Sequence, residues 1–161
     1  MHIAVLDDKI ADRKQLERLL DRESDRRIQT TGNLYIDTYG AKDALLTAPL
    51  KQYDFFMIDM MGPVTESLEI IKNLRAKEVS VPVCLMRNEE ELKDIKEIPD
   101  NLLFIEKPIK VQELTDLIGS VIEEIKAKEE EEAQIKQEQI EEYIKNNKGK
   151  IALKRIMNKL F

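Results

Sequence analysis

Several charged side chains of this sequence come just behind short apolar runs. Asp7 and Asp8 follow the first run, Asp59 follows the third, and Lys107 lies just beyond the fifth. In an open parallel sheet such residues meet at the rim formed by the carboxyl ends of the strands, where ligands bind. Three carboxylates there repel each other unless a cation lies between them, and hard oxygen ligands favour Mg²⁺ or Ca²⁺. Asp59 would then be both a metal ligand and a nucleophile toward phosphorus, with the metal and Lys107 neutralising the phosphoryl charge.

The elements that position these residues are predicted from an alternation of apolar runs and helical spacing. Several of the runs are apolar on both faces, which is typical of parallel strands covered by helices on each side. The predicted fold is therefore an α/β domain with a five-stranded parallel sheet. The predicted strands are residues 2–6, 34–39, 55–58, 81–86 and 102–105, and the predicted helices are residues 11–22, 41–46, 65–77, 89–96 and 111 onward.

The last predicted helix carries a core-packing stripe in its first turns: Leu114, Leu117, Ile118, Val121, Ile122 and Ile125. The four glutamates at residues 129–132 interrupt this stripe, and neither heptad frame stays apolar across them, so a continuous coiled coil is not predicted. We expect one domain over residues 1–127 and a helical extension over residues 128–161.

Composition favours a soluble cytoplasmic protein. A hydrophobic content of 42% in 161 residues is enough for one core and an appendage. The single cysteine, Cys84, lies in an apolar run and is expected to be a buried thiol in a reducing compartment. His2 is the only histidine, and we expect it to be inert. No segment approaches the roughly 20 apolar residues of a membrane span.

Charge is distributed unevenly along the chain. The net charge is −6, yet residues 145–161 hold six lysines or arginines and no acid. The remainder carries 20 basic and 32 acidic residues, a net charge of −12. An acidic body argues against nonspecific binding of nucleic acid, which needs clustered cations. Only the tail remains a candidate for such binding.

Three motifs together resemble the response-regulator receiver family. They are the paired Asp7-Asp8, the segment Tyr-Asp-Phe-Phe-Met-Ile-Asp-Met-Met-Gly-Pro at residues 53–63, and Lys107-Pro108. The resemblance covers residues 2 to about 127. It implies a flavodoxin-like (βα)5 receiver fold with the sheet order 2-1-3-4-5.

The same resemblance implies a role for each site residue. Asp59 would be the phosphoacceptor, and Asp8, Asp59 and the backbone carbonyl of Met61 would bind Mg²⁺, with Asp7 contributing mainly through water. Lys107 would pair with the phosphoryl group. Phe104 stands at the position of the family's aromatic switch residue.

One position departs from the family pattern. Where the family has a serine or threonine at the end of strand four, this chain has Arg87, and no serine or threonine lies between Ser80 and Thr115. A hydrogen bond to a charged group contributes about 1.5–3 kcal/mol, whereas a full two-state switch needs about 5.5 kcal/mol, so the loss blunts a switch without abolishing it. Arg87 could contact the phosphoryl oxygens with its guanidinium and become the switch residue. It could equally pair with a site aspartate in the position of the metal.

The resulting functional hypothesis is a response regulator of a two-component phosphorelay that signals through protein–protein interaction. Its partners would be a sensor histidine kinase or a phosphotransfer protein, and a homodimer is possible. Any catalysis would be limited to its own phosphorylation and dephosphorylation. The main alternative is a degenerate, phosphate-independent receiver that acts as an interaction module.

A second alternative is a DNA-binding regulator that uses the C-terminal extension. Residues 140–160 loosely resemble the first two helices of a winged-helix domain, but the sequence ends where the recognition helix should begin. We therefore expect a nucleic-acid partner only if the C-terminal tail provides the contact. The tail also carries apolar residues among its lysines and arginines, which predicts a basic amphipathic helix: Ile151, Leu153, Ile156, Met157, Leu160 and Phe161.

We predict that this basic end docks on the acidic body or on a second molecule. Exposed ion pairs contribute only about 0–1 kcal/mol each, so apolar burial at about 25 cal/mol per Å² must provide most of the affinity. Deleting residues 146–161 should change the solution mass or the hydrogen exchange of the body. A tail that exchanges freely in the full chain, with no mass change on deletion, would contradict docking.

Overall fold

Five apolar segments form one parallel sheet in the computed structural model, which describes residues 1–160 apart from the side chains of Ile151, Leu153 and Leu160. The strand order is β2-β1-β3-β4-β5, which confirms the predicted order. Strands β1 and β3 are almost wholly buried, as the apolar character of both their faces requires. The strands are β1 (His2–Asp7), β2 (Tyr35–Tyr39), β3 (Phe55–Asp59), β4 (Val83–Leu85) and β5 (Leu102–Phe104).

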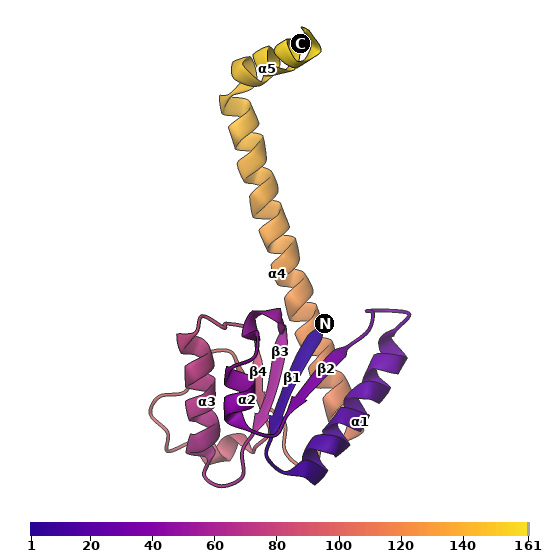
Figure 1. Ribbon diagram of the computed structural model, residues 1–161, viewed down its shortest axis with the longest axis vertical. Helices are drawn as coiled ribbons and strands as arrows, with labels where there is room; N and C mark the ends of the chain where they lie inside the picture. Colours follow the sequence, from indigo (N-terminus) through magenta and orange to yellow (C-terminus); the bar gives the residue numbers. More distant parts are fainter. Residues whose placement is uncertain (161) are drawn as a thin grey trace. The chain divides into compact units, whose positions relative to one another are not determined.

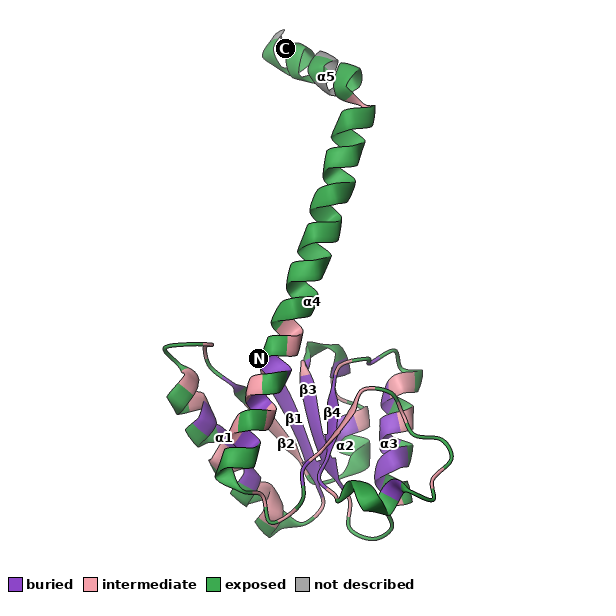
Figure 2. Cartoon of the chain, turned by 180° about the vertical axis from the view of Figure 1, so that it is seen from behind, coloured by how far each residue is buried: buried purple, intermediate pink, exposed green. Residues whose placement is uncertain are grey.

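Helices cover both faces of this sheet (Figure 1). One face packs with α2 (Lys42–Leu46) and α3 (Val64–Ala76) into a continuous apolar core. The other face is covered by α1 (Ile10–Arg27) and by the first turns of α4 (Val111–Asn146). Successive strand residues point to opposite faces, so each strand contributes to both layers. Figure 2 shows the buried residues concentrated in the strands and on the inner sides of these helices.

The predicted helix over residues 89–96 is wrong in length. The structure has only a short 3-10 turn, Glu89–Leu92, in which the Asn88 side chain accepts a hydrogen bond from the Glu90 backbone nitrogen. Leu92 is its single buried residue. One anchoring side chain provides too little apolar burial to hold a longer helix against its ordering entropy. A second 3-10 turn, Leu50–Gln52, precedes β3.

The chain divides into two compact units, Met1–Ile122 and Glu123–Phe161. Helix α4 continues without interruption to Asn146, and α5 (Lys148–Leu160) follows, which confirms the predicted helical extension. The domain boundary near residue 127 stays a prediction. In the second unit the large apolar side chains Ile135, Ile140, Tyr143, Ile144, Ile156 and Met157 are exposed.

Part of the predicted tail stripe lies outside the described residues, namely Phe161 and the side chains of Ile151, Leu153 and Leu160. Docking of the tail therefore stays a prediction. Among the described helices, none is both long enough and apolar enough to cross a membrane.

A buried acid ties α1 to the beginning of α4. Glu23 is only 1% exposed, and its carboxylate pairs with Arg26, with Arg27 at 3.1 Å and with the Thr115 hydroxyl. Arg27 also donates to the Thr115 carbonyl at 2.9 Å. This cluster is not predictable from the sequence, because the local sequence around an acid within a helix does not indicate that the acid is buried. The cluster fixes α4 against α1 on the same side of the sheet.

Replacing Glu23 with alanine should lower the free energy of unfolding by about 3 kcal/mol, because it leaves the half-buried Arg27 without its partner. Urea unfolding of the full chain measures this. The matched control is Glu69→Ala, which removes an exposed pair with Lys72 and should cost less than about 0.5 kcal/mol. Equal losses in the two variants would contradict a structural role for the buried cluster.

Candidate functional site

Two aspartates lie side by side at the carboxyl end of the sheet. Asp7 ends β1 and Asp59 ends β3, and the two are register partners in the parallel ladder. Asp7 is 1% exposed and Asp59 is 7% exposed. Buried carboxylates need cations or hydrogen-bond donors, because their charge loses the solvation of water. The partners of these two carboxylates therefore define the site.

Lys107 supplies one cation and contacts three carboxylates. Its Nζ atom lies 2.6 Å from Asp7 Oδ2, 2.7 Å from Asp59 Oδ2 and 3.0 Å from Asp12 Oδ2. The residue follows β5, and its peptide bond to Pro108 is cis. The structure thus brings together the lysine and two of the acids that the sequence singled out.

Arg87 supplies the second cation. Its Nε atom donates to Asp59 Oδ1 at 2.7 Å, so each oxygen of Asp59 has its own cationic partner. Its Nη2 atom donates to the Met60 carbonyl and, at 2.8 Å, to the Gly62 carbonyl. Its Nη1 atom lies 3.3 Å from Glu91 Oε1. The sequence left two hypotheses for Arg87, a contact with a phosphoryl group or an ion pair with a site aspartate. The structure has the ion pair, with Asp59.

The loop after β3 is held by further hydrogen bonds. Met61 donates its backbone N–H to Asp8 Oδ1 at 2.8 Å, and Met60 donates its own to the buried Ser67 hydroxyl at 3.0 Å. Gly62 has a φ of +98°, a conformation that favours glycine. The loop therefore presents its Met60 and Gly62 carbonyls to Arg87.

A divalent cation does not fit this arrangement. In the described part of the chain, no three acid, histidine or cysteine side chains are grouped as metal ligands. Both oxygens of Asp59 already contact Arg87 and Lys107, and Asp8 Oδ1 accepts a backbone N–H. Mg²⁺ binding stays a prediction, for an arrangement of the site in which Arg87 does not hold Asp59. The predicted ligands are Asp7, Asp8, Asp59 and the Met61 carbonyl.

The two predicted switch residues line one hollow. Phe104 is half-buried at the end of β5 and packs against the apolar core. It borders a hollow of about 420 Å³ together with Arg87. The same hollow has an acidic lining of Glu89, Glu106, Glu113 and Asp116. The switch roles of Phe104 and Arg87 stay predictions.

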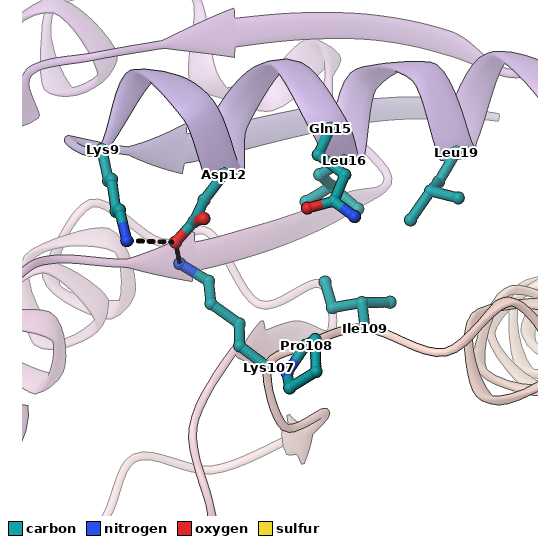
Figure 3. Close-up of a pocket in the computed structure, with 8 residues that line it drawn as sticks. All are labelled: Lys9, Asp12, Gln15, Leu16, Leu19, Lys107, Pro108 and Ile109. Carbon is teal, nitrogen blue, oxygen red and sulfur yellow. Dashed lines mark hydrogen bonds and ion pairs between the residues drawn. The ribbon is translucent and has the colours of Figure 1, made fainter.

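A second pocket, of about 290 Å³, adjoins the site between α1 and the loop after β5 (Figure 3). Its polar end holds Asp12, which lies 3.0 Å from Lys107 and 4.0 Å from Lys9. Its apolar end is lined by Leu16, Leu19, Pro108 and Ile109. Lys107 therefore belongs both to the carboxylate cluster and to this pocket.

Two residues of the site, Asp12 and Ser67, were not predicted from the sequence. A signal for Asp12 was available, because it lies in the first turn of α1, which begins just after the carboxyl end of β1. No sequence signal identifies Ser67, whose hydroxyl is fixed only by the tertiary position of Met60. His2, expected to be inert, lies 3.2 Å from Asp37 Oδ2 and edge-on to Tyr53. Cys84 is fully buried, as predicted, and burial raises the pKa of its thiol.

Burial and pairing oppose each other at the carboxylate cluster. Burial raises the pKa of Asp7 above its ordinary value of 3.8, although the Lys107 hydrogen bond acts to lower it. Burial would lower the pKa of Lys107, but its hydrogen bonds to Asp59, Asp7 and Asp12 outweigh this effect and hold it above 10.5. Burial likewise acts to lower the pKa of Arg87, and the hydrogen bond to Asp59 reverses the shift. Both cations are therefore charged at neutral pH.

Comparison with known proteins identifies the fold. No family model and no curated protein sequence matches the chain. A receiver-domain protein from Clostridium thermocellum matches with a TM-score of 0.61 and 17% identity, over 78% of this chain and 97% of that one. The receiver domain of a response regulator from Geobacillus stearothermophilus matches with a TM-score of 0.60 and 15% identity, over 80% and 97%.

A third structure, of a transiently phosphorylated switch in bacterial signal transduction, matches with a TM-score of 0.55 and 21% identity, over 76% of this chain and 94% of that one. The chain thus has the fold of response-regulator receiver domains. The receiver fold predicted from the sequence motifs is confirmed.

The pairing of Lys107 predicts a loss of stability at alkaline pH. A raised pKa in the folded state contributes stability that is fully present below the unfolded value, about 10.5, and lost as pH rises further. Lys107→Met should therefore be less stable than wild type at about pH 9, and the difference should shrink toward about pH 11.5. Urea unfolding at several pH values between these two measures the difference in the free energy of unfolding. Lys110→Met, which removes a lysine that is 76% exposed, is the control, and a difference for Lys107→Met that stays constant with pH would refute the pairing.

Proposed function

We propose that this chain is a cytoplasmic receiver of a two-component system that accepts a phosphoryl group on Asp59 and signals through protein–protein interaction. One observation supports this most directly. Asp59 ends the central strand of a receiver fold, and Lys107 lies 2.7 Å from one of its oxygens. The phosphodonor would be a sensor histidine kinase or a phosphotransfer protein. A homodimer is compatible with this role.

The proposed chemistry uses the charges around Asp59. One carboxylate oxygen forms a bond to phosphorus while the bond between phosphorus and the donor's leaving atom breaks, and the donor keeps that electron pair. The negative charges of carboxylate and phosphoryl group must be neutralised for attack. Lys107, which follows β5, would neutralise part of this charge. Arg87, which follows β4, has a planar guanidinium suited to binding phosphate oxygens. Mg²⁺, which receivers use for this purpose, would need the oxygens that Arg87 now holds.

A second candidate is supported by three of the four contacts of Arg87, those with Asp59 and with two loop carbonyls. A guanidinium that holds Asp59 and two loop carbonyls keeps the acceptor neutralised without any phosphate. The chain would then be a phosphate-independent interaction module. The DNA-binding alternative stays a prediction from the sequence.

Phosphodonor labelling separates the two candidates. Incubation with acetyl phosphate, with and without Mg²⁺, should add one phosphoryl group to the wild-type chain, read by intact mass. Asp59→Asn should show no such increase in mass. The control Asp43→Asn, which changes an exposed aspartate on α2, should label like wild type.

Two other results would contradict the first candidate. Labelling of Asp59→Asn at the wild-type level would show that the acceptor is another residue. No labelling of the wild type with either donor mixture would leave the phosphate-independent module as the better description.

A further inference from the structure

We propose that Arg87 is a tethered cation that occupies the place at Asp59 which a divalent metal would need, so that arginine and metal bind there in mutual exclusion. The inference does not depend on the proposed phosphorylation, because metal binding is measurable without any phosphodonor. It concerns what the site binds at rest. Three features of the site support it.

The first feature is the set of atoms that Arg87 contacts. These are a carboxylate oxygen of Asp59 and the backbone carbonyl oxygens of Met60 and Gly62. Carboxylate and carbonyl oxygens are the ligands that Mg²⁺ and Ca²⁺ prefer in proteins. In this chain the guanidinium donors converge on such a set instead. A metal that took Asp59 Oδ1 would have to displace the arginine.

The second feature is how firmly Arg87 is held. Its side chain is 18% exposed, and the outer end of its guanidinium lies 3.3 Å from Glu91. Its neighbour Met86 donates a backbone hydrogen bond to Ile58 at 3.0 Å, which ties the residue to the end of β3. Arg87 is thus anchored at both ends of its side chain. It is not a surface arginine that happens to pass near an acid.

The third feature is the charge that would remain without Arg87. Asp7, Asp12 and Asp59 share the ammonium of Lys107, and Lys9 lies near Asp12 alone, at 4.0 Å. Asp8 contacts the loop after β3 through the Met61 N–H. Removing the guanidinium leaves these carboxylates with too few cations. Uncompensated carboxylates near each other raise the affinity for an added cation. The chain without Arg87 should therefore gain a metal site.

The strength of the exclusion follows from competition. If Arg87 is released from Asp59 in about one molecule in ten, the apparent metal affinity falls about tenfold. Firmer anchoring lowers the affinity further. Replacing Arg87 with threonine removes the competitor and restores the side chain usual in the family.

Titration calorimetry of the full chain with Mg²⁺ tests this. Arg87→Thr should bind Mg²⁺ at least about tenfold more tightly than wild type, by the same competition. Adding Asp8→Asn to Arg87→Thr should abolish the gain in Mg²⁺ affinity, because Asp8 follows β1 and is the other acid that contacts the loop after β3. The control Lys93→Thr makes the same change of charge at an exposed position and should bind like wild type.

Three results would overturn the proposal. They are equal Mg²⁺ affinity in wild type and Arg87→Thr, an equal gain in Lys93→Thr, and a gain that survives Asp8→Asn. Each result leaves the labelling of Asp59 unaffected, so the two proposals fail separately.

A second measurement covers the case in which Arg87→Thr does not fold. Thermal unfolding of the wild-type chain should be insensitive to millimolar Mg²⁺, because a ligand raises the melting temperature only if it binds the native state. A rise that disappears in Asp8→Asn would show that millimolar Mg²⁺ binds the native chain in spite of Arg87, and would overturn the proposal that the arginine occupies the site at rest.

Discussion

The burial of Asp59 between two cations is the interaction on which the rest of this site depends. An ionised carboxylate that is 7% exposed is stable only with partners, and the sheet order decides where they come from. Strand β3 lies between β1 and β4. Its terminal aspartate therefore adjoins Asp7 on one side and Arg87, just beyond β4, on the other. Lys107, after β5, joins the cluster by the reach of its long side chain.

Much of this arrangement follows from the sequence by simple rules. Strands that are apolar on both faces require a parallel sheet with two helical layers, and polar residues at their carboxyl ends must then meet at one rim. Those two rules predict that Asp7, Asp59 and Lys107 lie together. The order of the strands came instead from the resemblance of the motifs to a known family.

The remaining details depend on tertiary contacts that no local pattern encodes. The direction of the Arg87 side chain is set by the Met60 and Gly62 carbonyls, whose orientation in turn depends on a positive φ and on the Ser67 hydroxyl. Glu23 has a helical sequence context like that of an exposed acid, yet it is buried by its contact with α4. The short turn after β4 is limited by having one buried anchor, which helical spacing alone does not reveal.

The saturation of Lys107 has a consequence for any anion that enters the site. An ammonium group has three N–H donors, and the three carboxylate contacts of Lys107 account for all of them. An anion that enters the site must therefore accept an N–H group that one of the three aspartates already accepts. Of the three aspartates, Asp12 has the longest contact with Lys107 Nζ, 3.0 Å, and the most exposed side chain, at 28%. Anion binding to Lys107 would therefore exchange one acceptor for another and leave the number of bonds to its ammonium unchanged.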